Sequence, residues 1–176
     1  FNFEPGQFIS LTLDIMQNDE LKPLTRQYSI SSSPTKKNYI DLTIKKMANG
    51  VMSNYVIDNL KVGTPVKIKG PYGIFTFKED VKKAVFIAGG SGISSLMAMI
   101  RYIVDKDLDT DFTLIFSNKT KENIIFREEL ENLINKGFKI INTLTRDNGD
   151  DWKGETGRIN KEMIKKYEEM YKGFFS

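Results

Sequence analysis

Hydrophobic and polar residues alternate along the first part of the chain. The alternation is regular over residues 8–13, 39–44 and 66–69, and turn-forming pairs such as Pro5-Gly6 and Asn49-Gly50 separate these segments. Because successive side chains of a strand face opposite sides, this pattern is typical of strands with one buried face. The sequence therefore predicts an antiparallel β domain, and the spacing permits either a small barrel or a sandwich.

From about residue 80, short apolar runs alternate with longer amphipathic segments. The expected strands are residues 84–88, 112–116 and 138–144. The expected helices are residues 94–105, 126–136 and 160–171. This order is typical of a parallel sheet with helices on its faces. Phe174 and Phe175 are expected to begin a further strand.

The composition excludes several kinds of chemistry. The 176 residues include no cysteine and no histidine. The chain therefore offers no disulfide, thiol nucleophile, cysteine-bound iron–sulfur cluster or histidine acid–base catalyst, and we expect no metal site. A carrier of hydride or electrons fits this composition, because its cofactor supplies the reactive atoms.

Charge and hydropathy indicate the setting in which the chain works. Hydrophobic residues make up 40% and charged residues 28%, as in a globular chain. No apolar run is long enough for a membrane span, and the first residues lack the features of a secretory signal, so we expect a cytoplasmic location. The net charge of +3 indicates a solvated surface, or a preference for an acidic redox partner. We expect no nucleic-acid partner.

The segment Arg26-Gln27-Tyr28-Ser29 is the first candidate binding motif. In a strand, Arg26 and Tyr28 share one face, where a guanidinium could contact a phosphate and a phenol could lie against a flat ring. Ser29 could bond the edge of that ring. Taken singly, these residues also fit an exposed strand arginine, a half-buried tyrosine and a turn serine.

The segment Gly50-Val51-Met52-Ser53 is the second candidate motif. It precedes a short helix that we expect to run from Ser53 to Leu60. Gly50 allows close approach of a ligand, and the first amides of a helix together with the Ser53 hydroxyl could hold phosphates. The alternative is an ordinary serine N-cap after a glycine turn. A ring site beside a phosphate site indicates a flavin.

The segment Gly89-Gly90-Ser91-Gly92 follows an apolar strand and precedes a helix that starts at Ser94 or Ser95. In that context a glycine cluster is typical of a nucleotide-binding loop, although its spacing is not Gly-x-Gly-x-x-Gly and a tight strand–helix turn is the alternative. The end of the next strand has Ser117, Asn118, Lys119 and Thr120 in place of a carboxylate. With Arg146, Lys119 favours the 2′-phosphate of NADPH over NADH, and solvated loop charges are the alternative.

These motifs, in this order, resemble the ferredoxin–NADP reductase family. The resemblance rests on Arg-x-Tyr-Ser, Gly-x-x-Ser, Gly70-Pro71-Tyr72-Gly73-Ile74-Phe75, Gly-Gly-x-Gly-Ile-Ser and Thr145-Arg146, and it covers nearly the whole chain. It implies a small antiparallel flavin-binding β-barrel in residues 1–78, followed by a Rossmann-like parallel α/β domain that binds NAD(P) in residues 79–176. The usual proline of the glycine loop is replaced by Ser95.

The resemblance also implies roles for individual residues. FAD is the usual cofactor, with FMN in some relatives, and the backbone of Ile44 and Lys45 would contact its ribityl chain. Ser29 and Ser94 would contact the reacting edges and are our candidate catalytic residues. The remaining cofactor contacts would come from the motif residues: Arg26, Gln27, Tyr28, Gly50, Val51, Met52, Ser53, Gly89, Gly90, Gly92, Ile93, Ser117, Asn118, Lys119, Thr145 and Arg146.

The implied function is a flavin-dependent NAD(P)H oxidoreductase. It would pass a hydride from the nicotinamide to FAD, and then electrons to an acceptor such as a ferredoxin, an oxygenase component, a haem protein or free flavin. The family has an earlier strand before Pro5 and a further strand after the last helix, so we expect both domains to be incomplete. A flavin- or nucleotide-binding sensor subunit without turnover is the main alternative, and a cofactor-free interaction domain is a third.

Overall fold

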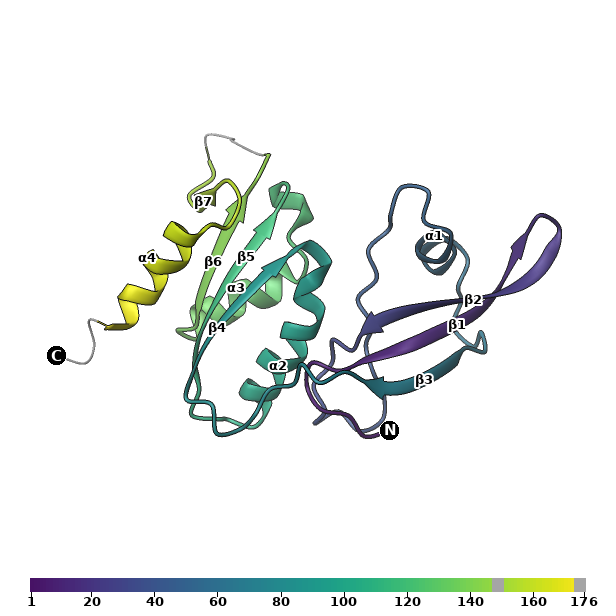
Figure 1. Ribbon diagram of the computed structural model, residues 1–176, viewed down its shortest axis with the longest axis horizontal. Helices are drawn as coiled ribbons and strands as arrows, with labels where there is room; N and C mark the ends of the chain where they lie inside the picture. Colours follow the sequence, from purple (N-terminus) through teal and green to yellow (C-terminus); the bar gives the residue numbers. More distant parts are fainter. Residues whose placement is uncertain (147–150, 173–176) are drawn as a thin grey trace. The chain divides into compact units, whose positions relative to one another are not determined.

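The computed structural model describes residues 1–146 and 151–172. The chain forms two compact units (Figure 1). The first unit contains Phe1–Lys78 and Ser94–Asp107, and the second contains Glu79–Ile93 and the chain from Leu108 onward. The two units are described separately below.

The first unit is built on an antiparallel sheet with the strand order β2-β1-β3. These strands are β1 (Phe8–Gln17), β2 (Glu20–Ser29) and β3 (Lys67–Tyr72). Asn18 and Asp19 join β1 to β2 with positive φ angles of 53° and 60°, as a tight hairpin requires. Alternate residues of β1 are buried, which confirms the predicted alternation.

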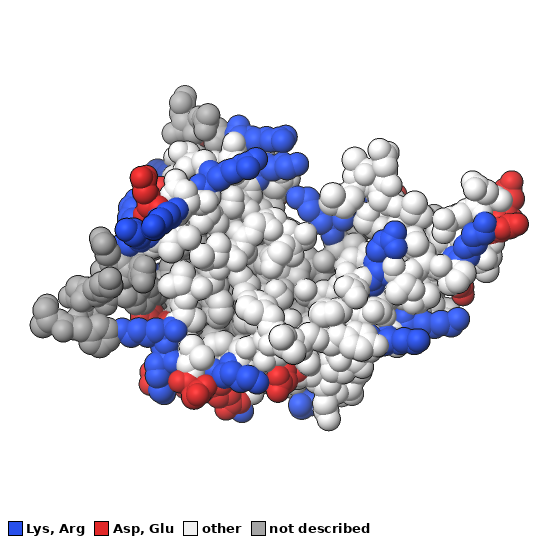
Figure 2. All heavy atoms as spheres, in the orientation of Figure 1, with Lys and Arg blue, Asp and Glu red and all other residues white. Residues whose placement is uncertain are grey.

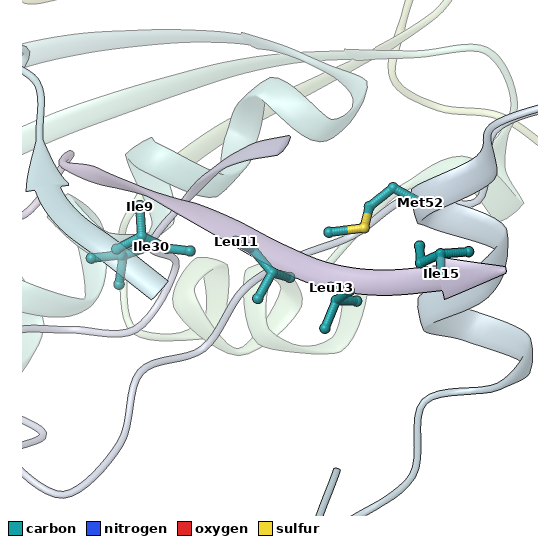
Figure 3. Packing of buried hydrophobic residues seen from close by; sticks show 6 residues of the cluster. All are labelled: Ile9, Leu11, Leu13, Ile15, Ile30 and Met52. Atoms are coloured by element: carbon teal, nitrogen blue, oxygen red, sulfur yellow. The ribbon is translucent and has the colours of Figure 1, made fainter. Parts of the chain in front are cut away.

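Six buried side chains form the core of this sheet: Ile9, Leu11, Leu13, Ile15, Ile30 and Met52 (Figure 3). Met52 comes from helix α1 (Val51–Asp58), which lies over the buried face of the sheet. The helix starts two residues before the predicted start at Ser53, because Gly50 is its N-cap. Sequence reasoning was therefore wrong on this boundary.

The predicted strand over residues 39–44 is also wrong, because this segment makes only one isolated bridge, from Leu42 to Ile30. The Ser32 side chain occupies one of the backbone groups that a longer ladder would use. The Asp41 amide donates to the Ser32 hydroxyl at 3.0 Å, and the Asp41 carbonyl accepts from both the amide and the hydroxyl of Ser31. Such local side-chain bonds compete with strand pairing. Among the described residues, the antiparallel sheet therefore has three strands.

Helix α2 (Ile93–Asp105) belongs mostly to the first unit, although it follows a strand of the second unit in the chain. Most of its first three turns is buried, including Met97, Ala98 and Ile100. A helix that is apolar on nearly all sides belongs in an interior. Its last two turns carry Arg101 and Asp105, which contact the loop that follows β2.

The second unit is a parallel sheet with the strand order β4-β5-β6-β7. The strands are β4 (Lys83–Gly89), β5 (Asp111–Asn118), β6 (Lys139–Leu144) and β7 (Glu155–Thr156). Helices α3 (Arg127–Asn135) and α4 (Lys161–Lys172) complete it, with single turns η1 (Gly90–Gly92) and η2 (Lys121–Asn123). The predicted strand–helix alternation is confirmed. The strand expected at Phe174 and Phe175 lies outside the described residues.

The central strand β5 is buried on both faces from Phe112 to Phe116, as expected of a strand inside a parallel sheet. The two-residue strand β7 was not predicted, since so short a segment carries no period. No helix in the described part of the chain is long and apolar enough to cross a membrane.

Candidate functional site

The register of the sheet places Arg26 and Tyr28 on the same face. Arg26 pairs with Leu11 and Tyr28 pairs with Ile9, and both partners point into the core. Tyr28 packs against the core cluster while part of its ring remains exposed. Burial raises the pKa of the Tyr28 phenol, and the Arg26 charge acts in the opposite direction.

Arg26 has donors to spare for an anion. Its Nη1 atom donates to the Thr25 carbonyl at 2.7 Å, and the side chain is otherwise largely exposed. A guanidinium has five N–H donors, so one such bond leaves most of the fork for a ligand. Gln27, between the two, pairs with Ser10 and faces outward, and Ser29 ends the strand opposite Phe8.

The Gly50–Ser53 segment forms a tight turn closed by the Ser53 side chain. The Ser53 hydroxyl accepts from the Met47 amide at 3.2 Å and donates to the Gly50 carbonyl at 3.3 Å. A Cβ atom on Gly50 would lie 2.4 Å from the Ser53 hydroxyl oxygen, so a larger residue there would displace this hydroxyl from the turn. The hydroxyl that was expected to hold phosphate is thus committed to the turn.

The backbone amides of this turn remain candidates for phosphate binding. Val51, Met52 and Ser53 form the first turn of α1, and first-turn amides have no acceptor within their own helix. The Met52 side chain is in the core, so only its amide is available for a ligand. Ile44 packs on the core cluster just before this turn, and Lys45 beside it is partly exposed.

The glycine loop of the second unit is open at each glycine. Gly89 ends β4, and Gly90, with a positive φ of 50°, begins the single turn η1 that leads into α2. A Cβ atom on Gly89, Gly90 or Gly92 would meet no described atom within 4 Å. At Gly89 and Gly92 neither crowding nor a positive φ demands glycine, and the open space would let a ligand approach the backbone closely. Ile93 and Ser94, which follow the loop, are buried.

The structure brings together the predicted residues at the ends of β5 and β6. The amide of Thr145 donates to the Asn118 carbonyl at 2.9 Å, and the amide of Arg146 donates to the Lys119 carbonyl at 3.0 Å. Lys119 and Arg146 have exposed side chains at this carboxyl edge, and Ser117 is half-buried. Parallel α/β sheets bind ligands at this edge.

Asn118 is unusual because its side chain is buried and unpaired. The residue is 5% exposed, and neither its Oδ1 nor its Nδ2 atom has a hydrogen-bond partner among the described residues. Buried amides are almost always paired, and an unpaired one is costly. The unpaired amide at this edge is the observation on which we base Asn118 as a candidate nucleotide contact.

Two further features of this edge were not predicted. Asn142 shares the sheet face of Asn118, and its Oδ1 atom is also buried without a partner among the described residues. A polar residue inside the run Ile140-Ile141-Asn142 was the available signal. Glu122 adds a carboxylate to the loop after β5, and a hydrogen bond from the Thr120 hydroxyl lowers its pKa.

Basic side chains do not form one dominant patch. On the face drawn in Figure 2, lysines and arginines are spread over the surface, with acidic side chains among them. Several make exposed ion pairs, such as Lys46 with Asp58 at 2.7 Å and Lys121 with Asp151 at 3.3 Å. No group of three or more metal-binding side chains is found in the part of the chain that the structure describes.

Comparison with known families identifies the class of both parts. Residues 1–77 match the oxidoreductase FAD-binding domain family, and residues 86–175 match the oxidoreductase NAD-binding domain family. The chain belongs to the ferredoxin reductase-like oxidoreductases, which confirms the predicted family and fold class. The expected cofactors, FAD and a nicotinamide nucleotide, are those of these two domain families.

Particular relatives are similar over most of this chain. It is 35% identical over 170 residues to the glycine betaine monooxygenase reductase subunit of Pseudomonas aeruginosa, covering 93% of this chain and 45% of that protein. It is 36% identical over 169 residues to NADH-cytochrome b5 reductase 1 of Pyricularia oryzae, covering 92% and 54%. The chain thus spans about half the length of these relatives.

Solved structures show the same fold. The cytochrome b5 reductase domain of Ulva prolifera nitrate reductase superimposes with a TM-score of 0.82 at 25% identity, covering 93% of this chain and 69% of that one. A ferredoxin NADP+ reductase from Neisseria gonorrhoeae with bound FAD and NADP gives a TM-score of 0.72 at 21% identity, covering 97% and 68%.

Proposed function

We propose that this chain is the flavin- and nicotinamide-binding part of an NAD(P)H-dependent oxidoreductase, which passes a hydride to FAD and electrons onward to a protein or small acceptor. The observation that carries the proposal is the pair Arg26 and Tyr28 on one face of β2, a cation and a partly exposed ring beside an apolar core. FAD, when bound, would accept a hydride and release its electrons singly.

The residues of the chain would bind and orient the two cofactors. Arg26 would hold a flavin phosphate together with the amides of Val51, Met52 and Ser53, while Tyr28 would lie against the ring. Ser29 at the end of β2 and Ser94 in the first turn of α2 are our candidates for contacts at the reacting edges.

Nucleotide binding would use the glycine loop and the edge of β5 and β6. The loop amides would approach the pyrophosphate, and the buried amide of Asn118 would bond the nucleotide. Lys119 and Arg146 would favour a 2′-phosphate, against the negative charge of Glu122 in the same loop. NADPH therefore stays our prediction over NADH.

The acceptor is proposed by class only. The relatives named above are a monooxygenase reductase subunit and a cytochrome b5 reductase, so among the possible acceptors we favour a protein such as an oxygenase component or a cytochrome. A cytoplasmic location stays a prediction from the sequence.

Spectroscopy of the purified protein tests the proposal. We expect yellow protein, or colourless protein that turns yellow with FAD, and bleaching of the flavin bands on anaerobic addition of NADPH or NADH. Binding of FAD without bleaching would favour a sensor subunit, and failure to bind FAD or FMN would reject a flavoprotein.

Arg26→Ala should weaken FAD binding about tenfold, as expected for a lost charged hydrogen bond. Lys22→Ala, which removes a cation four residues away on the same strand, should not.

The nucleotide preference has a test of its own. Lys119→Ala and Arg146→Ala should each reduce the preference for NADPH, measured as the ratio of kcat/KM for NADPH and NADH. Lys153→Ala, which removes an exposed cation outside the β5–β6 edge, is the control. An unchanged ratio in both variants would reject a 2′-phosphate site at this edge.

A further inference from the structure

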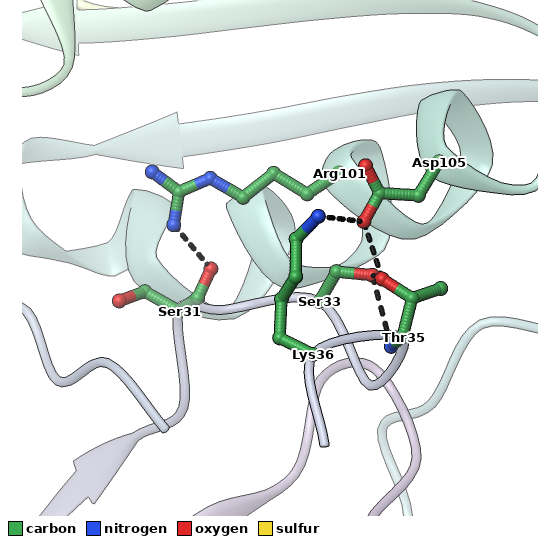
Figure 4. Close-up of polar contacts among 6 residues, drawn as sticks. All are labelled: Ser31, Ser33, Thr35, Lys36, Arg101 and Asp105. Carbon is green, nitrogen blue, oxygen red and sulfur yellow. Dashed lines mark hydrogen bonds and ion pairs between the residues drawn. The ribbon is translucent and has the colours of Figure 1, made fainter. Parts of the chain in front are cut away.

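The loop after the flavin motif is tied to helix α2 by a network of polar contacts (Figure 4). Arg101 Nη1 donates to the Ser31 carbonyl at 2.7 Å. One turn later, Asp105 accepts from the Thr35 hydroxyl and lies 3.6 Å from Lys36 Nζ. All of these residues lie in the first unit.

Ser31 lies where two chain segments meet. It is two residues after Ser29, and it is only 1% exposed. Its hydroxyl donates to the Asp41 carbonyl at 3.1 Å and accepts from the Thr43 hydroxyl at 2.9 Å. Thr43 directly precedes Ile44, so a single serine links the two segments that carry predicted flavin contacts.

Neither segment is held by a continuous strand ladder at this point. β2 ends at Ser29, and residues 39–44 make only the single bridge at Leu42. Few bonds join them: the amide and hydroxyl of Ser31 donate to the Asp41 carbonyl, the Asp41 amide donates to the Ser32 hydroxyl, and the Thr43 hydroxyl donates to the Ser31 hydroxyl. The Arg101 guanidinium is the charged donor to the Ser31 carbonyl, and charged hydrogen bonds are about twice as strong as neutral ones.

From this geometry we infer that Arg101 is a positioning residue of the flavin site. Through Ser31 it holds two segments in place: the end of β2 at Tyr28–Ser29, and the segment that leads through Thr43 to Ile44. The inference rests on the proposed flavin function, because the network can position a flavin site only if the chain binds flavin. Arg101 does not have to touch the cofactor. Supporting residues of this kind hold contact groups within the narrow limits that a binding site needs.

Two matched pairs of variants test this inference. Thr43→Val removes the hydroxyl that bonds Ser31, while Thr12→Val removes an equivalent hydroxyl bond, to Thr25 at 2.8 Å, on the outward face of the sheet. Arg101→Ala removes the guanidinium, while Arg101→Lys keeps a charged donor on a flexible stem. FAD binding is measured by fluorescence titration, and the position of the bound ring by visible circular dichroism.

We expect Thr43→Val and Arg101→Ala to raise the FAD Kd on the order of tenfold and to change the flavin dichroism, and Arg101→Lys to recover part of both. Thr12→Val should match the original protein. If Arg101→Ala does not fold, Thr43→Val decides, because it keeps the shape of the side chain. Variants that bind FAD with unchanged affinity and dichroism overturn the inference while the proposed function stands. If the original protein binds no flavin, the inference and the proposed function are both rejected.

Discussion

The unpaired amide of Asn118 gives a prediction in which stability and binding change in opposite directions. Replacing Asn118 with Leu, a residue of similar size, removes a donor and an acceptor that have no partner among the described residues. An unsatisfied buried polar group costs about 1–3 kcal/mol, so the ligand-free variant should gain stability of this order. For a domain of this size, each kcal/mol corresponds to roughly 2–4 °C in Tm.

The same substitution should weaken nucleotide binding. If the amide of Asn118 bonds the nucleotide, its loss leaves the ligand groups without partners, and the KM for NAD(P)H should rise roughly tenfold or more. The assays are thermal unfolding without ligands and steady-state reduction of a dye acceptor by NADH and by NADPH. Occupied by nucleotide, the original protein should regain most of the difference in Tm.

A neighbouring residue provides a control of opposite sign. Thr143 is fully buried on β6, but its hydroxyl donates to the Gly157 carbonyl at 2.7 Å. Thr143→Val should therefore destabilise the protein by about 1–2 kcal/mol, because it leaves that carbonyl unpaired.

A loss of stability in Asn118→Leu would refute the reasoning, since the amide would then be satisfied in solution. A gain in stability with unchanged KM would show that Asn118 does not face the ligand.

Three other expectations follow from single residues. Gly50→Ala should lower Tm and weaken FAD binding, because its Cβ would lie 2.4 Å from the Ser53 hydroxyl oxygen; normal binding would argue against the turn. Gly92→Ala meets no described atom within 4 Å, so it should leave Tm unchanged while raising the KM for NAD(P)H, and an unchanged KM would contradict close approach of the ligand. Partial burial acts to raise the pKa of Asp105, but hydrogen bonds from Thr35 and its neighbours outweigh it and hold the pKa below the usual value. Its contribution to stability is therefore present above about pH 4 and is lost as pH falls through the lowered pKa. In Asp105→Asn, the free energy of unfolding should fall less steeply with decreasing pH in that range. An unchanged pH dependence would show that Asp105 contributes nothing.

Elements with a strong period could be predicted from the sequence. The alternation along residues 8–13 reappears as the buried positions Ile9, Leu11 and Leu13 and continues to Ile15, and the apolar run 112–116 is the buried centre of β5. Burial alone decides such elements, and burial leaves a direct trace in the order of residue types. The same reasoning placed Arg26 and Tyr28 on one face, because the side-chain period of a strand is fixed.

Turn chemistry and distant contacts could not be predicted in this way. The start of α1 depends on Gly50 as N-cap and on a hydroxyl that reaches back from Ser53 to Met47. The bond from Arg101 to Ser31 joins residues 70 positions apart, and no local pattern records it. Asn118 could be predicted as a cofactor contact, but its lack of a partner is a property of the packed strands around it.

The failed strand at residues 39–44 is explained by the same residues that support the flavin site. Its alternation favours a strand, yet the Asp41 amide donates to the Ser32 hydroxyl and not to a strand carbonyl, and the segment makes one bridge, at Leu42. A ladder would fix this segment relative to Ile30 without any outside support. In its absence, Ile44 is held by its packing on the core cluster and by the bonds that run from Thr43 through Ser31 to Arg101. Local rules that fail in this manner are expected at functional sites, where a segment must meet a ligand and not a neighbouring strand. The interrupted ladder at residues 39–44 therefore gives the proposed role of Arg101 its physical basis.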